Sequence, residues 1–304
     1  MFREIIGHAP QKRMLEELRL AKKIPQALLF EGSDGIGKQL VAKAFAANIV
    51  EHDYNRLRII ERLPDKKNIS IEQIRELKHE AVLTGFSEGV RIFIINNAEK
   101  MTTEAANSFL KILEEPPQDV CFFLITGSSE ALPETILSRV LRLKFNELSQ
   151  FDAAQVLIGA GIEKDLAERC TILANGNIAI ARKMCNYGQD LMQLSINWYA
   201  SIVNGGYAAI YDICEQFGKI NSEDKEKAQL ILLLLRLQVR DMLYASCGIN
   251  RLNFSSQTGV NKDVSLVLAV DNCFTVAERA INGNANFRLT TEKLFIEIQD
   301  LIGC

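Results

Sequence analysis

Gly32-Ser33-Asp34-Gly35-Ile36-Gly37-Lys38 is the stretch of this sequence that decides the fold. Glycines and a lysine at this spacing are typical of a phosphate-binding loop, whose backbone N–H groups point at phosphate oxygens while the lysine adds positive charge. An apolar run of strand type, residues 27–31, precedes the loop, and residues 38–50 follow it with the pattern of a helix. This context predicts a P-loop domain, with these candidate nucleotide-binding residues: Gly32, Gly35, Gly37 and Lys38.

Two parts of the usual chemistry of such a loop are missing. The residue after the lysine should be Ser or Thr, whose hydroxyl holds Mg²⁺, but it is Gln39. The apolar run of residues 92–95 should end in acidic residues, and it ends in Asn96 and Asn97. These amides remove the charge that steadies the metal ion and the carboxylate that would orient water, and Glu99 is out of strand register for that role. We expect a degenerate site with weak or no nucleotide binding and no intrinsic ATPase activity.

The first 145 residues alternate between strand-like and helical segments. Residues 90–95 and 120–126 are apolar runs of strand length, rich in β-branched and aromatic residues. Between them, residues 103–113 carry apolar residues at helical spacing, and Pro116-Pro117 stops that helix. Alternation of this kind is the signature of a parallel sheet with crossover helices, so the fold class predicted here is α/β.

From about residue 147 the strand signals fade, and the chain is expected to be all-α. Short helices are predicted first, at residues 151–160, 164–174 and 178–187. Longer helices are predicted after residue 190, at residues 191–204, 207–218, 222–247, 262–282 and 290–302. The predicted domains are an α/β domain over residues 1–146, a helical lid over residues 147–189 and a helical domain over residues 190–304.

Composition limits the class of protein. With 304 residues, 48% hydrophobic and 24% charged, the chain resembles an ordinary globular protein with room for two or three domains. Its longest apolar run, residues 230–235, is too short to span a bilayer and predicts a buried helix. Seven cysteines without a C-x-x-C pair favour a cytoplasmic location with reduced thiols. A net charge of −3 excludes nucleic-acid binding driven by overall charge, so a DNA contact would need a local patch or a partner.

Several further segments resemble the motifs of a known family. Residues 107–117, Asn-Ser-Phe-Leu-Lys-Ile-Leu-Glu-Glu-Pro-Pro, are similar to the clamp-loader signature N-A-L-L-K-x-L-E-E-P-P. Residues 132–140 resemble its L-P-x-T-I-x-S-R-C segment with valine in place of cysteine. Residues 24–32 and 69–77 are similar to its opening and to one of its helix entries. The chain is identified by resemblance as a member of the AAA+ clamp loaders of DNA replication over roughly residues 1–190, and the remainder agrees mainly in length and helicity.

Within this family the resemblance is closest to the delta-prime branch of bacterial DNA polymerase III. It implies an AAA+ P-loop sheet domain, a small three-helix lid and a C-terminal helical collar that serves oligomerisation. It also implies that Arg139, the arginine of the Ser-Arg-Cys motif, is an arginine finger that reaches ATP held by a neighbouring subunit. By resemblance, the chain is a non-catalytic subunit that supports ATP-driven loading of the sliding clamp on primed DNA.

Two more family positions concern the chain's own site. The family's lid motif carries an arginine three residues after its glycine; counting from Gly176 gives Ala179, and Arg182 comes three positions too late. Thr126 falls at the end of its strand, where the family keeps a polar sensor. The resemblance therefore implies that the lid arginine is lost and that one polar element of the site survives.

The resemblance also implies cofactors and partners. ATP and Mg²⁺ are expected at neighbouring subunits, with no cofactor of the chain's own. Many relatives carry a four-cysteine zinc module, but residues 48–71 contain no cysteine, so no zinc is expected. The expected partners are gamma/tau-like ATPase subunits, a delta-like subunit, the sliding clamp through the complex and primed DNA indirectly, with no membrane.

Other interpretations stay open at this point. One is an active AAA+ ATPase that uses Lys38 with atypical metal ligands. Another is a stand-alone P-loop nucleotide kinase, against which the clamp-loader strings and the long helical tail argue. Arg139 could be a salt-bridge residue, and the basic residues within 56–67 are either a solvated loop or a contact to DNA phosphates or a partner. The histidines lack metal-ligand spacing and are interpreted as structural or surface residues: His8, His52 and His79.

Overall fold

The computed structural model describes residues 1–2, 4–82, 89–247 and 263–302 of the chain. The chain divides into two compact units. The sheet unit comprises Met1–Gly161 with Asn175–Ala179, and the helical unit comprises Ile162–Ala174 with Ile180–Cys304. The boundaries of the three predicted domains stay a prediction.

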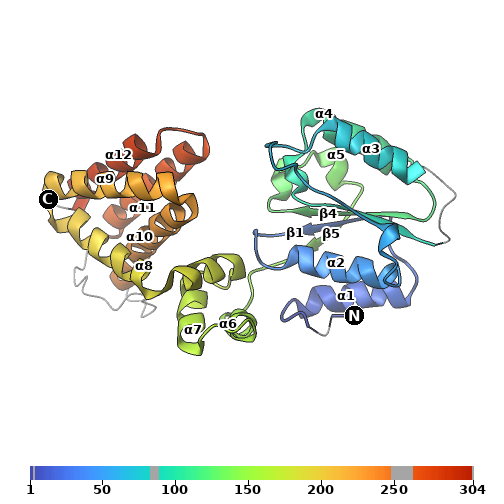
Figure 1. Cartoon of the computed structure of the whole chain (residues 1–304), viewed down its shortest axis with the longest axis horizontal. Coiled ribbons are helices and arrows are strands. Elements are labelled where there is room, and N and C mark those ends of the chain that lie inside the picture. Colours follow the sequence, from blue (N-terminus) through green and yellow to red (C-terminus); the bar gives the residue numbers. More distant parts are fainter. Residues whose placement is uncertain (3, 83–88, 248–262, 303–304) are drawn as a thin grey trace. The chain divides into compact units, whose positions relative to one another are not determined.

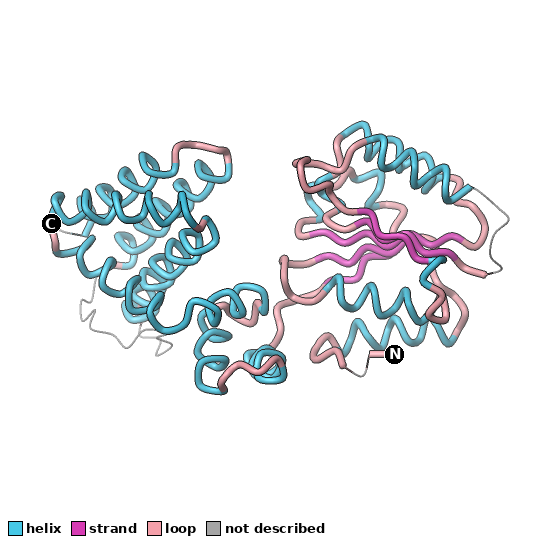
Figure 2. The backbone as a smooth tube through the Cα atoms, viewed as in Figure 1, coloured by secondary structure: helices cyan, strands magenta, loops and turns pink. Residues whose placement is uncertain are grey.

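The sheet unit is built on five strands that pair in parallel in the order β2-β3-β4-β1-β5 (Figures 1 and 2). The strands are β1 (Ala27–Glu31), β2 (Leu57–Ile60), β3 (Arg91–Ile95), β4 (Val120–Thr126) and β5 (Leu141–Lys144). Every residue of β1 and β4 is buried, because helices cover both faces of the sheet at its centre. The predicted parallel sheet with crossover helices is confirmed.

Helices cover the two faces of the sheet (Figure 1). On one face lie α1 (Ala9–Leu20) and α2 (Lys38–Ile49), and on the other α3 (Ile71–Val82), α4 (Thr103–Glu114) and α5 (Glu134–Leu137). Alternate residues of β4 serve the two layers. Phe123 stacks on Phe45 of α2 with ring centroids 5.5 Å apart, and Phe122 meets Phe109 of α4 edge-on at 5.4 Å. These aromatic pairs hold both helical layers to the sheet.

Strong apolar patterns predict their elements correctly, and weak patterns do not. The predicted strands and helices in the first 126 residues match β1, α2, β3, α4 and β4 closely. β2 and β5 are not predicted, because each has four residues, carries charged side chains such as Arg58 and Arg142, and lies at an edge of the sheet. The interpretation of residues 56–67 as a solvated loop is therefore wrong for residues 57–60, which form the edge strand β2.

The helical unit is all-α, as predicted. It contains α7 (Lys164–Leu173), most of α8 (Ile178–Asn204), α9 (Gly206–Glu223), α10 (Lys225–Ser246), α11 (Val264–Asn282) and α12 (Phe287–Ile302). The predicted helices 178–187 and 191–204 form one element, α8, with a kink at Gly188, whose φ is 70°. The predicted helix start at residue 262 lies outside the described residues. The apolar run at residues 230–235 lies in α10 and is largely buried, as predicted.

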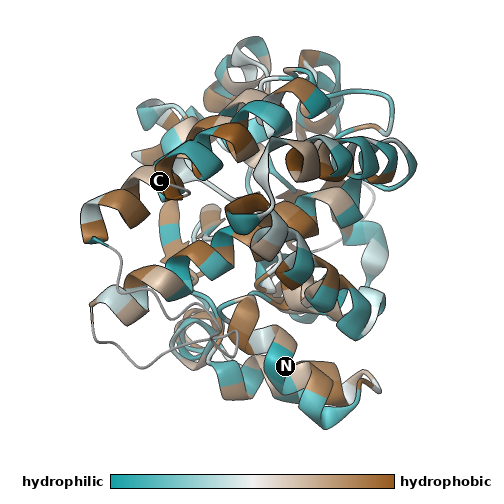
Figure 3. Ribbon diagram, turned by 90° about the vertical axis from the view of Figure 1, so that its left-hand side faces the viewer, coloured by the Kyte–Doolittle hydropathy of each residue, from teal (hydrophilic) through white to brown (hydrophobic). Residues whose placement is uncertain are grey.

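Hydrophobic and hydrophilic residues alternate along the helices, as the brown and teal parts of the ribbon show in Figure 3. In α10, the polar side includes Arg236, whose guanidinium bonds to Asp271 and Glu278 of α11 at 2.8 and 2.6 Å. Phe217 of α9 packs edge-on against Trp198 at 5.2 Å. Within the described ranges, no helix combines the length and apolar character that crossing a membrane requires.

Replacing Phe123 by alanine should lower the free energy of unfolding of the sheet unit by about 3–5 kcal/mol, because a cavity would be left against Phe45. Hydrogen exchange of the β1 and β4 amides measures this unit separately from the helical one. Leu20→Ala, at a side chain that is 71% exposed, is the control and should change stability by less than about 0.5 kcal/mol. Unchanged protection of β4 in the Phe123→Ala variant would contradict the described packing.

Candidate nucleotide site

The phosphate loop, residues 32–38, connects β1 to α2 at the carboxyl edge of the sheet, where open parallel sheets bind ligands. Its glycines have positive φ angles, 146° at Gly32, 81° at Gly35 and 104° at Gly37. A side chain at Gly35 would also collide with the Cβ of Ala179. Backbone conformation and close packing together require these glycines.

The side chain of Lys38 is buried, with 4% of the residue exposed, and its ammonium bonds to the loop itself. Nζ donates to the carbonyl oxygens of Gly32 and Ser33 at 2.5 and 2.7 Å and lies 3.5 Å from Oδ1 of Asp34. Burial lowers the pKa of Lys38, while the charges of Asp34 and Glu99 oppose that shift. Because an ammonium has three N–H donors, these acceptors use all of them.

Asp34 is a functional candidate that sequence reasoning missed, because the loop motif accepts any residue at its position. Its side chain is 74% exposed and approaches Gly127, where an added Cβ would lie 2.9 Å from Oδ1. Gly127 follows Thr126, the last residue of β4. The Asp34 carboxylate therefore lies between the Lys38 ammonium and the carboxyl end of β4.

Thr126, the predicted polar sensor, is fully buried at the end of β4. Its hydroxyl donates to the carbonyl oxygen of Ser128 at 2.9 Å and accepts from the N–H of Ser128 at 3.1 Å. The hydroxyl proton is thus used inside the turn that follows the strand. Thr126 shares the carboxyl edge with the phosphate loop, but its hydrogen bonds are local.

Gln39 and Asn96 are brought together by a carboxylate that sequence reasoning missed. Nε2 of Gln39 donates to Oε1 of Glu61 at 2.9 Å, and Nδ2 of Asn96 lies 3.4 Å from the same oxygen. Glu61 directly follows β2, so it became visible only once that edge strand was known. Two amide groups at the positions of the usual metal ligands therefore donate hydrogen bonds to one carboxylate oxygen.

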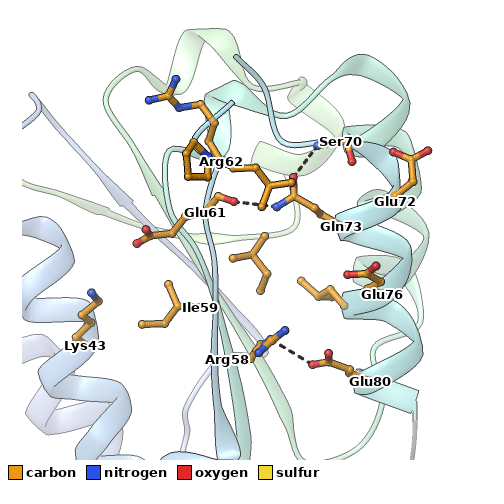
Figure 4. A pocket seen from close by; sticks show the side chains of 14 residues that line it. Lys43, Arg58, Ile59, Glu61, Arg62, Ser70, Glu72, Gln73, Glu76 and Glu80 are labelled. Atoms are coloured by element: carbon orange, nitrogen blue, oxygen red, sulfur yellow. Dashed lines mark hydrogen bonds and ion pairs between the residues drawn. The ribbon is translucent and has the colours of Figure 1, made fainter. Parts of the chain in front are cut away.

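Glu61 is held from both sides. Its main-chain carbonyl accepts from Nε2 of Gln73 at 2.8 Å, and in Figure 4 its carboxylate points away from α3, toward the side of α2 that carries Lys43. A groove of about 680 Å³ runs beside it, along β2 and α3. Arg58 pairs with Glu80 within this groove at 3.6 Å (Figure 4). The lining of the groove includes Glu61 but no residue of the phosphate loop.

Asn97 does not join the Gln39 and Asn96 pair. Its φ of 53° turns the chain into the short 3-10 helix η2 (Ala98–Lys100), and its Nδ2 lies 3.5 Å from Oε1 of Glu99. The other oxygen of Glu99 is buried and has no hydrogen-bond partner among the described residues. Throughout the described ranges, no group of three or more His, Cys, Asp or Glu side chains is placed to hold a metal ion.

His8 holds the phosphate loop from the amino-terminal segment. Its Nε2 lies 2.7 Å from the carbonyl oxygen of Ile36, a contact that requires the proton on Nε2. The ring also packs edge-on against Phe145, with centroids 5.0 Å apart. Burial is the main cause that lowers the pKa of His8. The contact with the Ile36 carbonyl therefore supports the interpretation of His8 as a structural residue.

The start of α8 holds the loop from another direction. Nδ2 of Asn177 donates to the carbonyl of Asp34 at 2.7 Å, and the N–H of Ala179 donates to the carbonyl of Gly35 at 3.3 Å. Ala179 is the position at which the family would carry its lid arginine, so a methyl group lies against the loop there. Glu147 accepts a bond of 2.6 Å from the hydroxyl of the loop serine, which lowers the pKa of this carboxyl.

Arg139 lies at the amino ends of the parallel strands, opposite the end that carries the phosphate loop. It follows α5 and precedes β5, whose first residue, Leu141, pairs with Leu28 near the start of β1. Its Nη1 donates to the carbonyl of Thr135 at 3.0 Å, and its Nη2 bonds to Oε1 of Glu114 at 3.2 Å. Arg139 is therefore at the amino edge of the parallel sheet, whereas the phosphate loop is at the carboxyl edge.

Comparison with known proteins finds similarity to subunits of DNA polymerase III. The profile of the family described as "DNA polymerase III, delta subunit" matches residues 47–149. DNA polymerase III subunit delta′ of Bacillus subtilis is 32% identical over 178 residues, which is 52% of this chain and 53% of that protein. The chain is thus similar to clamp-loader subunits of DNA polymerase III. DNA polymerase III subunit tau of the same organism is 22% identical to this chain over 283 residues, 80% of the chain and 50% of the relative.

The clamp-loader resemblance drawn from the sequence is thereby confirmed. The chain spans about half the length of these curated relatives. Among solved structures, a DNA polymerase III gamma subunit-related protein from Thermotoga maritima aligns with 94% of the chain and 98% of its own length, at 19% identity and a TM-score of 0.48.

Replacing His8 by asparagine should remove a pH dependence from the stability of the sheet unit. The pKa of His8 is below its ordinary value of 6.5 in the folded state, so the unfolded chain takes up the proton first as the pH falls. The stability is therefore full above the ordinary pKa and is lost as the pH falls toward the folded pKa. Thermal unfolding of the wild type should show a melting temperature that falls as the pH drops below about 6.5, a fall that His8→Asn lacks.

The control for this experiment is His79→Gln, at an exposed histidine of α3. It should keep the wild-type dependence of melting temperature on pH. If His8→Asn and the wild type show the same dependence of melting temperature on pH, burial does not lower the pKa of His8 in the folded chain as described.

Proposed function

We propose that this chain is a non-catalytic, delta-prime-like subunit of a clamp loader, which lends Arg139 in trans to ATP bound by a neighbouring subunit. Similarity to clamp-loader subunits supports the class of assembly. Two features of the sheet unit support the finer assignment. The positions of the metal ligands in its own site carry amides, and its exposed arginine is at the opposite edge of the sheet.

The position of Arg139 is the observation that carries this proposal. The phosphate loop follows Glu31, which pairs with Lys144, the last residue of β5, whereas Arg139 precedes the first residue of β5. The five residues of β1 alone span about 16 Å. An arginine at the amino edge is thus separated from its own loop by the length of the sheet, and it can serve a phosphate only outside this chain.

The Arg139 guanidinium is suited to such a role. Its side chain is 38% exposed, and its ion pair with Glu114 is itself partly exposed. Exposed ion pairs contribute little stability, so exchange of Glu114 for a phosphate group costs little. The Thr135 carbonyl fixes the other side of the guanidinium, which keeps the planar cation oriented. In an arginine finger, a cation held in this way stabilises the charge that develops on the transferred phosphoryl group.

The proposal assigns cofactors and partners accordingly. ATP and Mg²⁺ belong to gamma/tau-like ATPase subunits, one of which faces Arg139. A delta-like subunit completes the assembly, the sliding clamp is reached through the complex, and primed DNA is contacted indirectly. The helical unit, with its long helices α8 to α12, provides the collar that holds the subunits together.

An active ATPase with atypical metal ligands is the alternative, and the retained glycine conformations and Lys38 favour it. Against it stand the hydrogen bonds of Gln39 and Asn96 to Glu61 and the use of all three Lys38 protons within the loop. The purified chain should therefore show no Mg²⁺-dependent ATP turnover. Robust turnover that Lys38→Ala abolishes would refute the non-catalytic assignment.

In the assembled complex, Arg139→Ala should lower ATP turnover at one interface by about 10³-fold or more, because the transition-state charge loses its cation. ATPase assays of the complex, with co-purification of all subunits as the check on assembly, measure this effect. Arg75→Ala, at an exposed arginine of α3, is the control and should keep full turnover. Glu114→Gln should also keep full turnover, because Glu114 only holds the Arg139 side chain when the chain is outside the complex. Normal turnover in Arg139→Ala would exclude the finger.

A further inference from the structure

The residues of the nucleotide site do not fit ATP and Mg²⁺. At the positions of the hydroxyl and carboxylate that hold Mg²⁺, Gln39 and Asn96 direct N–H groups at Glu61. We infer that the carboxylates of Asp34 and Glu61 are internal substitutes for the ligand, so that the chain closes its own nucleotide site. This inference rests on the proposed non-catalytic function and adds the residues that enforce it.

The ammonium of Lys38 is buried and already has acceptors within the protein. A buried charge must be paired and hydrogen-bonded, and the loop carbonyls together with Asp34 satisfy it completely. A phosphate group would have to displace the Asp34 carboxylate, the one charged acceptor of the three. Because the 3.5 Å contact with Asp34 is also the longest of the three, it is the point at which the site can be opened.

The Asp34 carboxylate lies between Lys38 and Gly127, the residue directly after the end of β4. This places it at the carboxyl edge of the two central strands, beside the loop that would cradle phosphates. The carboxylate thus supplies the negative charge that a terminal phosphate would supply to the same lysine. Removing the carboxylate leaves the backbone of the cradle in place, since the Asp34 carbonyl still accepts from Asn177.

Glu61 accepts the hydrogen bonds of both amides that stand at the positions of the usual metal ligands. A divalent cation needs oxygen ligands, but the two amides present nitrogen donors to Oε1 of Glu61, which in turn satisfies both. The bond from Gln73 to the Glu61 carbonyl fixes the backbone of this residue (Figure 4). The cluster is therefore complete without a metal ion, and recruiting one would require both amides to turn.

The charges around the loop point the same way. Asp34 and Glu99 act on Lys38, Glu147 bonds to the loop serine, and Glu61 bonds to the residue that follows the lysine. Two carboxylates thus act on the buried ammonium, and two more bond to residues of or beside the loop. Without a divalent cation, the phosphates of a nucleotide would add their charge to this acidic set, and like charges at short range repel strongly.

Isothermal titration of the full chain with ATP, with and without Mg²⁺, tests this inference. The wild type should show no detectable binding at an ATP concentration of about 1 mM. Asp34→Ala and Asp34→Asn should bind ATP at least about tenfold more tightly than the wild type, with or without Mg²⁺. Asp65→Ala, which removes the same charge from an exposed loop, is the matched control and should behave as the wild type. The combined variant D34A/E61A/Q39T/N96D should gain a further tightening that depends on Mg²⁺.

The outcomes separate the two claims. If the wild type binds ATP as tightly as Asp34→Ala without hydrolysing it, the closed site is refuted while the non-catalytic assignment stands. If neither Asp34 variant gains affinity while circular dichroism shows both folded, the closed site is likewise refuted. Turnover by the wild type would instead overturn the proposed function itself. Asp34→Asn keeps the size of the side chain, so a packing defect in Asp34→Ala cannot hide the answer.

Discussion

The buried ammonium of Lys38 is the interaction on which the rest of the nucleotide site depends. A charge in this position must be satisfied, and the loop does so by turning its own carbonyl oxygens toward Nζ. That turn requires positive φ angles at Gly32 and Gly35. The resulting loop also presents outward carbonyls, to which Asn177 and the N–H of Ala179 donate. The loop is in this way held on both sides by hydrogen bonds within the protein, although Ser33, Asp34 and Gly35 are exposed.

The polarity of the parallel sheet separates the two halves of the proposed chemistry. Every strand ends at the edge that carries the phosphate loop and begins at the edge that carries Arg139. The loop at the carboxyl edge is filled by Asp34 and by the Glu61 cluster, whereas the arginine at the amino edge is exposed and only lightly paired with Glu114. The same fold can thus lose one site and keep the other, because no residue belongs to both.

The three amides at the end of β3 and after Lys38 looked equivalent in the sequence, and they are not equivalent in space. Gln39 and Asn96 converge on one oxygen of Glu61, while Asn97 turns away into η2. Glu61 could not be predicted, because β2 is four residues long with an exposed arginine in it, and a weak edge strand has no clear apolar pattern. Asp34 could not be predicted either, since its role depends on the nearby end of β4, about ninety residues further along the chain.

The sequence by itself determined the class of fold, the resemblance to clamp loaders and the absence of the usual metal ligands. These follow from local signals: the glycine and lysine spacing, the continuous apolar runs of β1 and β4, and residues 107–117. Only the tertiary structure decided what takes the place of the lost ligands, because the carboxylates that do so come from a variable loop position and from a neighbouring strand. It also decided that Arg139 and the phosphate loop lie at opposite edges, since that follows from the pairing of β1 with β5 and not from any motif.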